Sequence, residues 1–574
     1  MVSYKQEYQN WLNSSLLSAN EKNELLTIAE NENEIKERFY SYLEFGTAGL
    51  RGKMRVGTNA MNRFTVAQAT QGLANLIIKE GRSNDGVVIA YDSRNDSELF
   101  AKVSASVLAA NHIKTYIFDE LRPTPELSFA LRELKCVAGI NITASHNPKE
   151  YNGYKAYWED GAQLPPEHAK TVSNEIEQID IFSDIKYSDF DKSVSSGDII
   201  ILDQDMDEKY LEAVMSQLVN PTAITKVSND LKIVYSPLHG TGYRLIPDIL
   251  SRCGVEHLYV VPEQMEINGD FPTVEKPNPE YPEVFELGIE IANNVDSTLV
   301  IATDPDADRV GVVTKNTNGE FITISGNQMG ALLIDYIITA YEETGTMPNN
   351  PYAVKTIVST ELVAKICQAH GVKLHNVLTG FKFIGEVIKN YEQSGADAAY
   401  LFGFEESYGY LKGTYARDKD AVVATMLICE MTAFYHAKGM TLFDALNSLY
   451  DKYGYYLEAN QEIYMQGVDG KEKMANLMNT LRNNAPESIA NNQIVEIGDY
   501  LKATITNKLT GDCISTDLPS SNVISFKMAN GDVVIARPSG TEPKIKFYYL
   551  LSGESKDKMN VKLDAYKAFI NQFV

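Results

Sequence analysis

Cysteine is scarce in this chain of 574 residues. The five cysteines lie far apart, and no two of them form a Cys-x-x-Cys pair. An odd number of scattered thiols excludes a simple disulfide framework, and their spacing gives no zinc site. The pattern favours reduced thiols and therefore a cytoplasmic location.

Long apolar runs and an excess of positive charge are also missing. Met1–Asn20 lacks the apolar core of a signal peptide, and the most apolar stretch, Met329–Ala340, is interrupted by Asp335. The formal net charge of −25 argues against binding nucleic acid or an anionic membrane surface. A small anionic ligand stays compatible, because a locally basic site can lie within an acidic surface. We expect a soluble protein with no nucleic-acid and no membrane partner.

Apolar strands alternate with amphipathic helices over most of the chain. Residues 86–91 predict a strand, 98–111 a helix and 114–118 the next strand. The same order predicts mostly parallel sheets with helices on their faces. Further strands are predicted at 231–235, 258–261, 298–303, 352–358 and 398–402.

The two ends of the chain have a different pattern. Residues 3–40 predict helix, with an inner face formed by Trp11, Leu12, Leu16, Leu25, Leu26 and Ile28. After about residue 455, strands at 494–505, 523–528, 533–536 and 545–551 precede a final helix at 556–573. This pattern is typical of an antiparallel α+β domain.

The fold class expected from these patterns is α/β. Three similar α/β domains with mostly parallel sheets would be followed by a C-terminal α+β domain, arranged around a central active-site cleft. The predicted domains are 1–204, 205–318, 319–450 and 451–574.

A serine follows an apolar run in the segment 141–148. Ser145 comes after Val137–Ile142, and Pro148 stops the strand from continuing. A hydroxyl fixed at a strand end is well placed to be a nucleophile, although serine before a turn is more often a cap. No Gly-x-Ser-x-Gly elbow surrounds Ser145, which argues against an α/β-hydrolase.

The residues after this serine add possible partners for a phosphate. His146 is adjacent, and Lys149 and Lys155 would place positive charge nearby. Between these lysines, Asn152-Gly153 has the composition of a hairpin turn.

Three carboxylates alternate along a predicted strand-to-strand loop. Asp304, Asp306 and Asp308 would repel one another unless a cation or a basic group lies between them. The EF-hand spacing fails, because the sixth position is Arg309 and the twelfth is Lys315. A site with three protein oxygens leaves room for a phosphate oxygen and suits Mg²⁺. A solvated acidic turn is the alternative.

Two further loops carry polar groups suited to a phosphorylated sugar. Glu405 and Ser407 lie at i and i+2 of an extended loop, on the same side, where they could contact sugar hydroxyls. The segment 537–544 combines an arginine, two hydroxyls and a glycine, which together suit an anion. It is not a Walker loop. Ordinary polar surface loops are the alternative for both.

With these four segments in chain order, the sequence resembles the α-D-phosphohexomutase superfamily, and most of all its phosphoglucomutase and phosphopentomutase-like branch. The resemblance rests on Thr-Ala-Ser-His-Asn-Pro at 143–148, Asp-x-Asp-x-Asp-Arg at 304–309, Glu-x-Ser at 405–407 and Arg-Pro-Ser-Gly-Thr-x-Pro at 537–543. It extends over essentially the whole chain, from Gly46–Arg51 to Lys544.

The resemblance implies a role for each matched residue. Ser145 would be the phosphorylated serine and, with Asp304, Asp306 and Asp308, would hold one Mg²⁺ per chain. Arg51 and Arg309 would place positive charge near the transferring phosphoryl group, and Lys419 or His146 would transfer the proton. The implied substrate contacts come from Thr379, Gly380, Lys382, Glu405, Ser407, Arg537, Ser539, Gly540, Thr541 and Lys544.

The chain departs from the family pattern at a few positions. Many relatives carry two glycines at Lys149-Glu150 and glycines at Pro305 and Ala307, and Phe404 replaces the glycine of Gly-Glu-x-Ser. These departures leave the preferred sugar open.

The implied activity is that of an isomerase-class phosphotransferase. It would interconvert glucose 1-phosphate and glucose 6-phosphate through a phosphoserine enzyme, with glucose 1,6-bisphosphate as intermediate and activator. A phosphomannomutase or phosphopentomutase would use the same mechanism. A phosphatase with an aspartyl nucleophile and a catalytically silent sugar-phosphate-binding protein are the more distant alternatives. The enzyme would act on small sugar phosphates as a monomer or homodimer.

Overall fold

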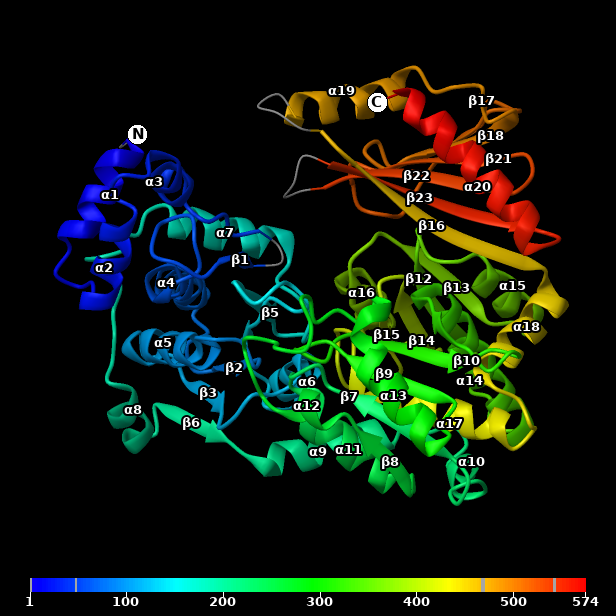
Figure 1. The fold of residues 1–574 in the computed structure, drawn as a ribbon. Helices are drawn as coiled ribbons and strands as arrows, with labels where there is room; N and C mark the ends of the chain where they lie inside the picture. Colours follow the sequence, from blue (N-terminus) through cyan, green and yellow to red (C-terminus); the bar gives the residue numbers. More distant parts are fainter. Residues whose placement is uncertain (1–2, 47–48, 466–469, 540–543, 574) are drawn as a thin grey trace. The chain divides into compact units, whose positions relative to one another are not determined.

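The computed structural model describes residues 3–46, 49–465, 470–539 and 544–573 (Figure 1). The chain forms two compact units. The first unit comprises Met1–Ile324, Ile388–Ser394 and Gly409–Gly439, and the second unit comprises Ser325–Val387, Gly395–Tyr408 and Met440–Val574. Each unit therefore combines segments that are separate in sequence, and the four predicted domain boundaries stay predictions.

The first unit begins with the helices α1 (Tyr4–Asn13), α2 (Ala19–Thr27) and α3 (Glu32–Phe39). Helix α2 starts with a capping box, in which the side chains of Ser18 and Glu21 each accept a hydrogen bond from the other residue's backbone N–H. The helical segment expected from the sequence is thus divided into three.

This division decides which apolar side chains face inward. Trp11, Leu25 and Ile28 are buried in the core shared by the three helices, as predicted. Leu16 and Leu26 are exposed, so their assignment to the inner face was wrong. Each break changes the helix direction, and one helical period therefore does not apply across all three helices.

A mixed sheet follows, in the order β1-β5-β4-β2-β3-β6. The strands β4, β2, β3 and β6 run parallel to one another, whereas β5 is antiparallel to both β1 and β4. Every residue of β2 and β4 is buried, which explains why both are apolar except for Asn141 of β4. The strand bounds are β1 (Leu50–Lys53), β2 (Val87–Tyr91), β3 (Thr115–Phe118), β4 (Ala138–Ile142), β5 (Tyr151–Trp158) and β6 (Ile199–Leu202).

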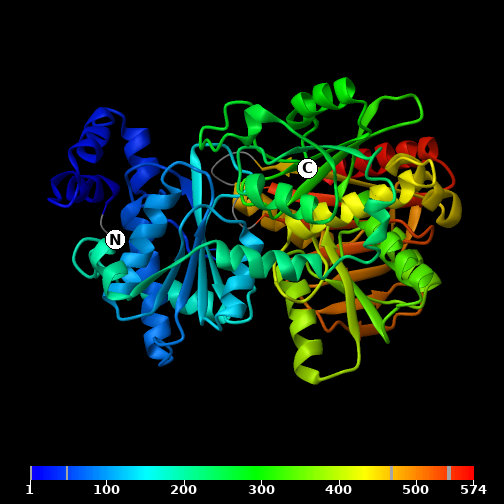
Figure 2. The same cartoon turned by 90° about the horizontal axis from the view of Figure 1, so that it is seen from below.

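Helices pack on both faces of this sheet, as the turned view in Figure 2 shows for the blue and cyan part of the chain. Helix α4 packs against both α5 and α7, and α6 packs on β2 and β4. The helices are α4 (Arg63–Lys79), α5 (Ser97–Ala110), α6 (Thr124–Glu133), α7 (Pro166–Ile176) and α8 (Phe190–Ser196).

The predicted hairpin turn at Asn152-Gly153 is wrong, because both residues lie inside β5. A Cβ at Gly153 would approach the backbone oxygen of Thr143 to 2.5 Å. The glycine thus allows β5 to pass close to the chain just before Ser145, which is a different use of the residue from a turn.

The second sheet of the first unit has the order β11-β10-β9-β7-β8. Strands β8, β7 and β9 are parallel, and β9, β10 and β11 form an antiparallel meander. The bounds are β7 (Lys232–Ser236), β8 (His257–Val260), β9 (Leu299–Thr303), β10 (Val310–Lys315) and β11 (Phe321–Ile324). The turn between β9 and β10 carries the acidic motif.

The remaining elements of the first unit surround this sheet. Helix α17 packs on α9, α10, α11 and β10, although it follows them by many residues in sequence. The bounds are α9 (Gln204–Met215), α10 (Thr222–Thr225), α11 (Gly242–Arg252), α12 (Pro262–Met265), η1 (Pro282–Phe285), α13 (Glu286–Val295), β15 (Gly409–Leu411) and α17 (Ala421–His436).

The second unit begins with a parallel α/β arrangement in which β12 lies between β13 and β14. Helix α14 packs against β14, α15 and α18. The bounds are α14 (Gly326–Thr344), β12 (Pro351–Thr356), α15 (Leu362–Ala369), β13 (Lys373–Val377), α16 (Phe381–Ser394), β14 (Ala399–Glu405) and α18 (Leu442–Tyr453). The last residues of α16 belong to the first unit.

The C-terminal part of the second unit is an antiparallel sheet in the order β16-β23-β22-β21-β18-β19-β20, with β17 beside β18. The single strand predicted at 494–505 is wrong: a turn, with Ala503 at a φ of +53°, separates β18 from β19. The bounds are β16 (Tyr455–Tyr464), α19 (Gly470–Asn483), β17 (Ser488–Ile489), β18 (Asn492–Asp499), β19 (Thr504–Asn507), β20 (Cys513–Ser515), β21 (Ile524–Met528), β22 (Val533–Pro538), β23 (Lys544–Gly553), α20 (Lys556–Ile570) and η2 (Asn571–Phe573).

The predicted fold class, three α/β domains followed by an α+β domain, is confirmed. Across the described ranges, every helix is too short or too polar to cross a bilayer.

The close approach at Gly153 gives a stability prediction. We expect Gly153→Ala to lower the free energy of unfolding by about 1–3 kcal/mol, because its Cβ would meet rigid backbone. Gly139→Ala in β4 is the matched control, since its Cβ would meet the movable Leu131 Cδ1 at 2.9 Å. Urea unfolding measures both, and equal losses in the two variants would contradict the prediction.

Candidate active site

Ser145 lies on the turn that follows β4. Its φ of +53° is in the left-handed region, which residues with a side chain seldom adopt. Its N–H donates to Thr143 Oγ1 at 2.8 Å, which stabilises the turn. The side chain is buried, and its Oγ donates to Asp304 Oδ2 at 2.7 Å. The serine and the acidic loop that the sequence singled out are therefore in direct contact.

The acidic loop is held rigidly between β9 and β10. Asp304 Oδ1 accepts hydrogen bonds from the N–H groups of Asp308 at 3.1 Å and Arg309 at 2.9 Å. Behind the loop, a Cβ at Gly240 would come within 2.4 Å of Pro305 Cα, and Thr241 N–H donates to Pro305 O at 2.8 Å. These contacts fix the turn around Pro305.

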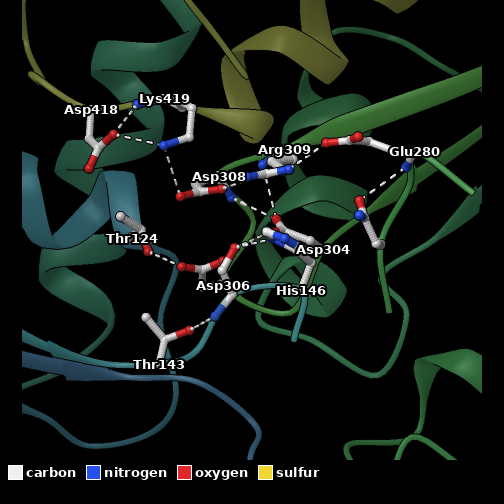
Figure 3. A network of polar contacts seen from close by, with 12 residues as sticks. Thr124, Thr143, His146, Glu280, Asp304, Asp306, Asp308, Arg309, Asp418 and Lys419 are labelled. Carbon is white, nitrogen blue, oxygen red and sulfur yellow. Dashed lines mark hydrogen bonds and ion pairs between the residues drawn. The ribbon is translucent and has the colours of Figure 1, made fainter. Parts of the chain in front are cut away.

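The hydrogen bonds to the other two carboxylates go to Oδ2, and Asp308 Oδ1 lies 3.9 Å from Arg309 Nε (Figure 3). Asp306 Oδ2 accepts hydrogen bonds from Thr124 Oγ1 at 2.8 Å and Lys155 Nζ at 2.6 Å. Asp308 Oδ2 lies 3.3 Å from Lys155 Nζ and 3.1 Å from Lys419 Nζ. Groups from distant parts of the sequence thus orient the three aspartates.

The cluster fits a hard divalent cation. All three aspartates are buried, and each offers one ligand atom within 4.8 Å of the others. Among the residues that the structure describes, none donates a hydrogen bond to Asp306 Oδ1 or Asp308 Oδ1. A buried polar atom left without a partner costs roughly 1–3 kcal/mol, and more when it is charged. Buried carboxylate oxygens that accept no hydrogen bond are suitable ligands for a hard divalent cation.

Electrostatics support the same interpretation. Burial, together with the charges of Asp306 and Asp308, raises the pKa of Asp304 well above its usual value. Burial acts in the same direction on Asp308, but Lys419, Lys155 and Arg309 outweigh it and lower the pKa of that carboxyl. A cation bound between the aspartates would favour the ionised form of Asp304.

The predicted cationic residues lie around this cluster or near the serine. Arg51 Nη1 donates to Asn147 Oδ1 at 3.2 Å, within the turn that carries Ser145. Arg309 forms an ion pair with Glu280. His146 Nδ1 lies 3.2 Å from Ser145 Oγ. Burial first, and then the charges of Arg309 and Arg51, lower the pKa of His146 well below its usual value, so its imidazole is neutral near pH 7.

Sequence reasoning missed two polar contacts of this site. It named Lys155 only as positive charge near a phosphate, and it did not name Thr124. Lys155 lies opposite Asn141 in the β4–β5 register, and Asn141 Nδ2 donates to Thr124 Oγ1 at 2.7 Å. The β4–β5 register places Lys155 beside Asn141, whose side chain contacts Thr124. The supposed turn at Asn152-Gly153 concealed this register.

The predicted sugar-reading residues lie in the second unit. Glu405, at the end of β14, accepts a hydrogen bond from Gly380 N–H at 2.7 Å, which joins two of the predicted segments. Thr379 precedes this glycine, and Lys382 lies in the first turn of α16, where burial lowers its pKa. Ser407 is half-buried in the loop after β14.

Phe404 has a structural explanation. It is buried, and a Cβ at Gly330 of α14 would lie 2.3 Å from its ring. The ring of Phe404 therefore fits against α14 because the facing residue is a glycine.

The predicted phosphate clamp begins at the end of β22 in the same unit. Arg537 lies in β22 opposite Lys546 of β23. Ser539 N–H donates to Lys544 O at 2.9 Å, and Lys544 Nζ lies 3.1 Å from Glu462. Gly540 and Thr541 lie outside the described residues.

The structure therefore places the predicted residues in two groups. Ser145, His146, Arg51, Arg309, Lys419 and the three aspartates belong to the first unit, and Thr379, Gly380, Lys382, Glu405, Ser407, Arg537, Ser539 and Lys544 belong to the second. Their individual roles stay predictions.

A buried serine hydroxyl that is hydrogen-bonded to a buried acidic turn able to hold a divalent cation suits a phosphoryl-transfer enzyme. Models of the phosphoglucomutase/phosphomannomutase α/β/α domains I, II and III match residues 42–181, 208–319 and 325–453. The chain belongs to the phosphoglucomutase/phosphomannomutase family. The predicted family and its mutase class of enzyme are confirmed.

Individual relatives agree with this assignment. A phosphoglucomutase of Staphylococcus haemolyticus is 37% identical over 92% of this chain and 93% of its own length. The open form of parafusin, a phosphoglucomutase from Paramecium, has a TM-score of 0.68 at 17% identity and covers 93% of this chain and 96% of its own. A phosphoglucomutase/phosphomannomutase family protein from Burkholderia thailandensis has a TM-score of 0.65 at 17% identity, covering 92% and 97%. The two solved structures support the fold.

The contact between Thr124 and Asp306 gives a metal-binding prediction. We expect Thr124→Val to weaken divalent-cation affinity by about 10-fold, because the hydrogen bond that orients Asp306 is lost while the shape is kept. Calorimetric titration with Mg²⁺ measures the affinity. Thr432→Val in α17, which removes only a bond to Ile428 O at 2.7 Å, is the control. Equal affinities in both variants would refute the role of Thr124.

Proposed function

We propose that this chain is a phosphoglucomutase that interconverts glucose 1-phosphate and glucose 6-phosphate through a phosphoserine at Ser145. The observation that supports it most directly is the 2.7 Å hydrogen bond between Ser145 Oγ and Asp304 within the buried acidic cluster. The phosphoglucomutase of Staphylococcus haemolyticus, which is 37% identical over most of the chain, supports the same activity.

In the proposed cycle, a sugar hydroxyl attacks the phosphorus of phosphoserine 145. A bond forms between that hydroxyl oxygen and phosphorus, and the bond between phosphorus and Ser145 Oγ breaks. The product, glucose 1,6-bisphosphate, then reverses its orientation without leaving the enzyme and returns its other phosphoryl group to Ser145. Added bisphosphate would also activate enzyme that has lost its phosphate.

The acidic cluster would hold one Mg²⁺ through Asp304, Asp306 and Asp308, with a phosphoserine oxygen as a further ligand. When bound, this ion neutralises charge on the transferring phosphoryl group. Arg51 and Arg309 add positive charge from the protein itself. Fixed cations of this kind stabilise the transition state without reorganisation.

The hydroxyl proton needs an acceptor, for which His146 and Lys419 are the candidates. The imidazole of His146 is neutral and can accept a proton, but burial and the neighbouring arginines lower its pKa and so make it a weaker base than an ordinary histidine. Lys419 lies 3.1 Å from Asp308 and 3.2 Å from Asp418, which stabilise its ammonium form, so it would first have to release a proton.

Glu405 and Ser407 would bind sugar hydroxyls, aided by Thr379, Gly380 and Lys382. Arg537, Ser539, Gly540, Thr541 and Lys544 would bind the phosphate that does not react. Because the sugar must be held in two orientations, this clamp should recognise phosphate whichever carbon bears it. The cytoplasmic location and the monomeric or homodimeric state stay predictions.

The nucleophile is tested by Ser145→Ala. We expect mutase turnover to fall at least 10³-fold, because the atom that stores the phosphoryl group is gone. Phosphopeptide mapping of the wild-type protein should find phosphate on Ser145. Phosphate on Asp304 instead would indicate the phosphatase alternative, and full turnover by the alanine variant would remove the proposed nucleophile.

The preferred sugar is tested by a substrate panel. With trace sugar bisphosphate added, we expect kcat/KM for glucose 1-phosphate to exceed that for mannose, glucosamine, ribose and deoxyribose 1-phosphates by at least 10-fold. A preference for the mannose or a pentose phosphate would establish a phosphomannomutase or phosphopentomutase with the same chemistry.

A further inference from the structure

Arg94, on the loop after β2, is bonded to the turn that carries Ser145. Its Nη1 donates to Pro148 O at 2.9 Å and Tyr151 O at 3.0 Å. Its Nη2 donates to Ser145 O and Asn147 O, each at 2.5 Å. One guanidinium therefore contacts four backbone carbonyls within seven consecutive residues of this turn.

The guanidinium is itself held in place from the other side. Arg94 Nε lies 3.2 Å from Asp92 Oδ2, and neither side chain is exposed. Asp92 Oδ1 in turn accepts hydrogen bonds from Arg94 N–H at 2.9 Å and Ser97 Oγ at 2.8 Å. The ring of Phe271 lies 5.0 Å from the guanidinium carbon. Both terminal nitrogens of Arg94 are thus hydrogen-bonded to the turn, and its Nε is ion-paired with Asp92.

Ser145 needs such support because its backbone is in the left-handed region. A strained conformation of this kind costs about 1–3 kcal/mol and persists only where the surroundings enforce it. The bond from Arg94 to Ser145 O fixes the peptide plane that follows the strained residue, and the other three bonds fix the rest of the turn.

We propose that Arg94 is a positioning residue that holds the Ser145 turn in its strained conformation and so keeps Ser145 Oγ beside Asp304. This inference rests on the proposed function, in which Ser145 Oγ accepts and returns the phosphoryl group. The part played by Arg94 is indirect, since these four hydrogen bonds to the turn all go to backbone oxygens.

Lysine cannot replace this arginine. An ammonium group donates from a single nitrogen, whereas the planar guanidinium reaches carbonyls on two sides at once. Arg94→Lys would keep the charge but leave some of the four buried carbonyls without a donor. The turn would then relax, and a displacement of the reacting atom by about 1 Å can cost about 10²-fold in rate.

The decisive experiment compares Arg94→Lys with the wild-type enzyme. We expect kcat to fall about 10²-fold while KM for glucose 1-phosphate changes less than threefold, because the proposed sugar contacts lie on other residues. Hydrogen exchange of the amides in 143–151 should become at least 10-fold faster in the variant. The phosphorus NMR signal of phosphoserine 145 should also shift or broaden.

Arg38→Lys is the matched control. Arg38 is also a buried arginine, and it donates to Glu34 at 2.9 Å and to Val56 O at 3.4 Å, in contacts outside the Ser145 turn. We expect this variant to lose stability but to keep the wild-type kcat and the wild-type exchange in 143–151.

Two further measurements keep the outcome decisive. If Arg94→Lys does not fold, Asp92→Asn tests the same positioning role by removing the charge that anchors Arg94, and kcat should fall about 10-fold. Wild-type kcat and wild-type exchange in the folded variant would overturn the positioning role. If the wild-type protein itself showed no mutase turnover and no phosphoserine, the proposed function would fail. Hydrogen exchange would still test whether Arg94 holds the Ser145 turn.

Discussion

Three carboxylates buried in one turn are the constraint on which the first unit depends. Such a cluster is stable only if each carboxylate is hydrogen-bonded, paired with a cation or bound to a metal ion. The chain supplies Thr124 from α6, Lys155 from β5 and Lys419 from the segment between β15 and α17. These residues are almost 300 positions apart in sequence, so satisfying one acidic turn requires three separate segments to pack together.

The same constraint explains where the backbone is strained. Ser145 and Ala307 both have a positive φ, one on each side of the contact between the serine turn and the acidic loop. Glycines at 153 and 240 let neighbouring backbone approach these turns to distances that a Cβ would forbid. Strain at these two turns is thus balanced by close packing directly behind them.

The local sequence made many of the strands and the loops of the candidate site predictable. The buried strands β2 and β4 were readable as apolar runs, and the loops with Ser145 and Asp304 followed from where those runs end. Asn152-Gly153 misled because a glycine needed for close backbone approach has the same local signature as one in a turn. Lys155 and Thr124 acquire their meaning only through strand register and tertiary contact, and no local pattern carries that information.

The division of residues between the two units bears on specificity. The groups proposed to move the phosphoryl group all lie in the first unit, and phosphoryl transfer does not depend on which sugar carries the hydroxyl. The proposed sugar and phosphate contacts lie in the second unit, where Phe404 packs on Gly330 directly before Glu405. A change of sugar within this family could therefore arise from residues such as Phe404 and leave the buried acidic turn, with its demanding set of partners, unaltered.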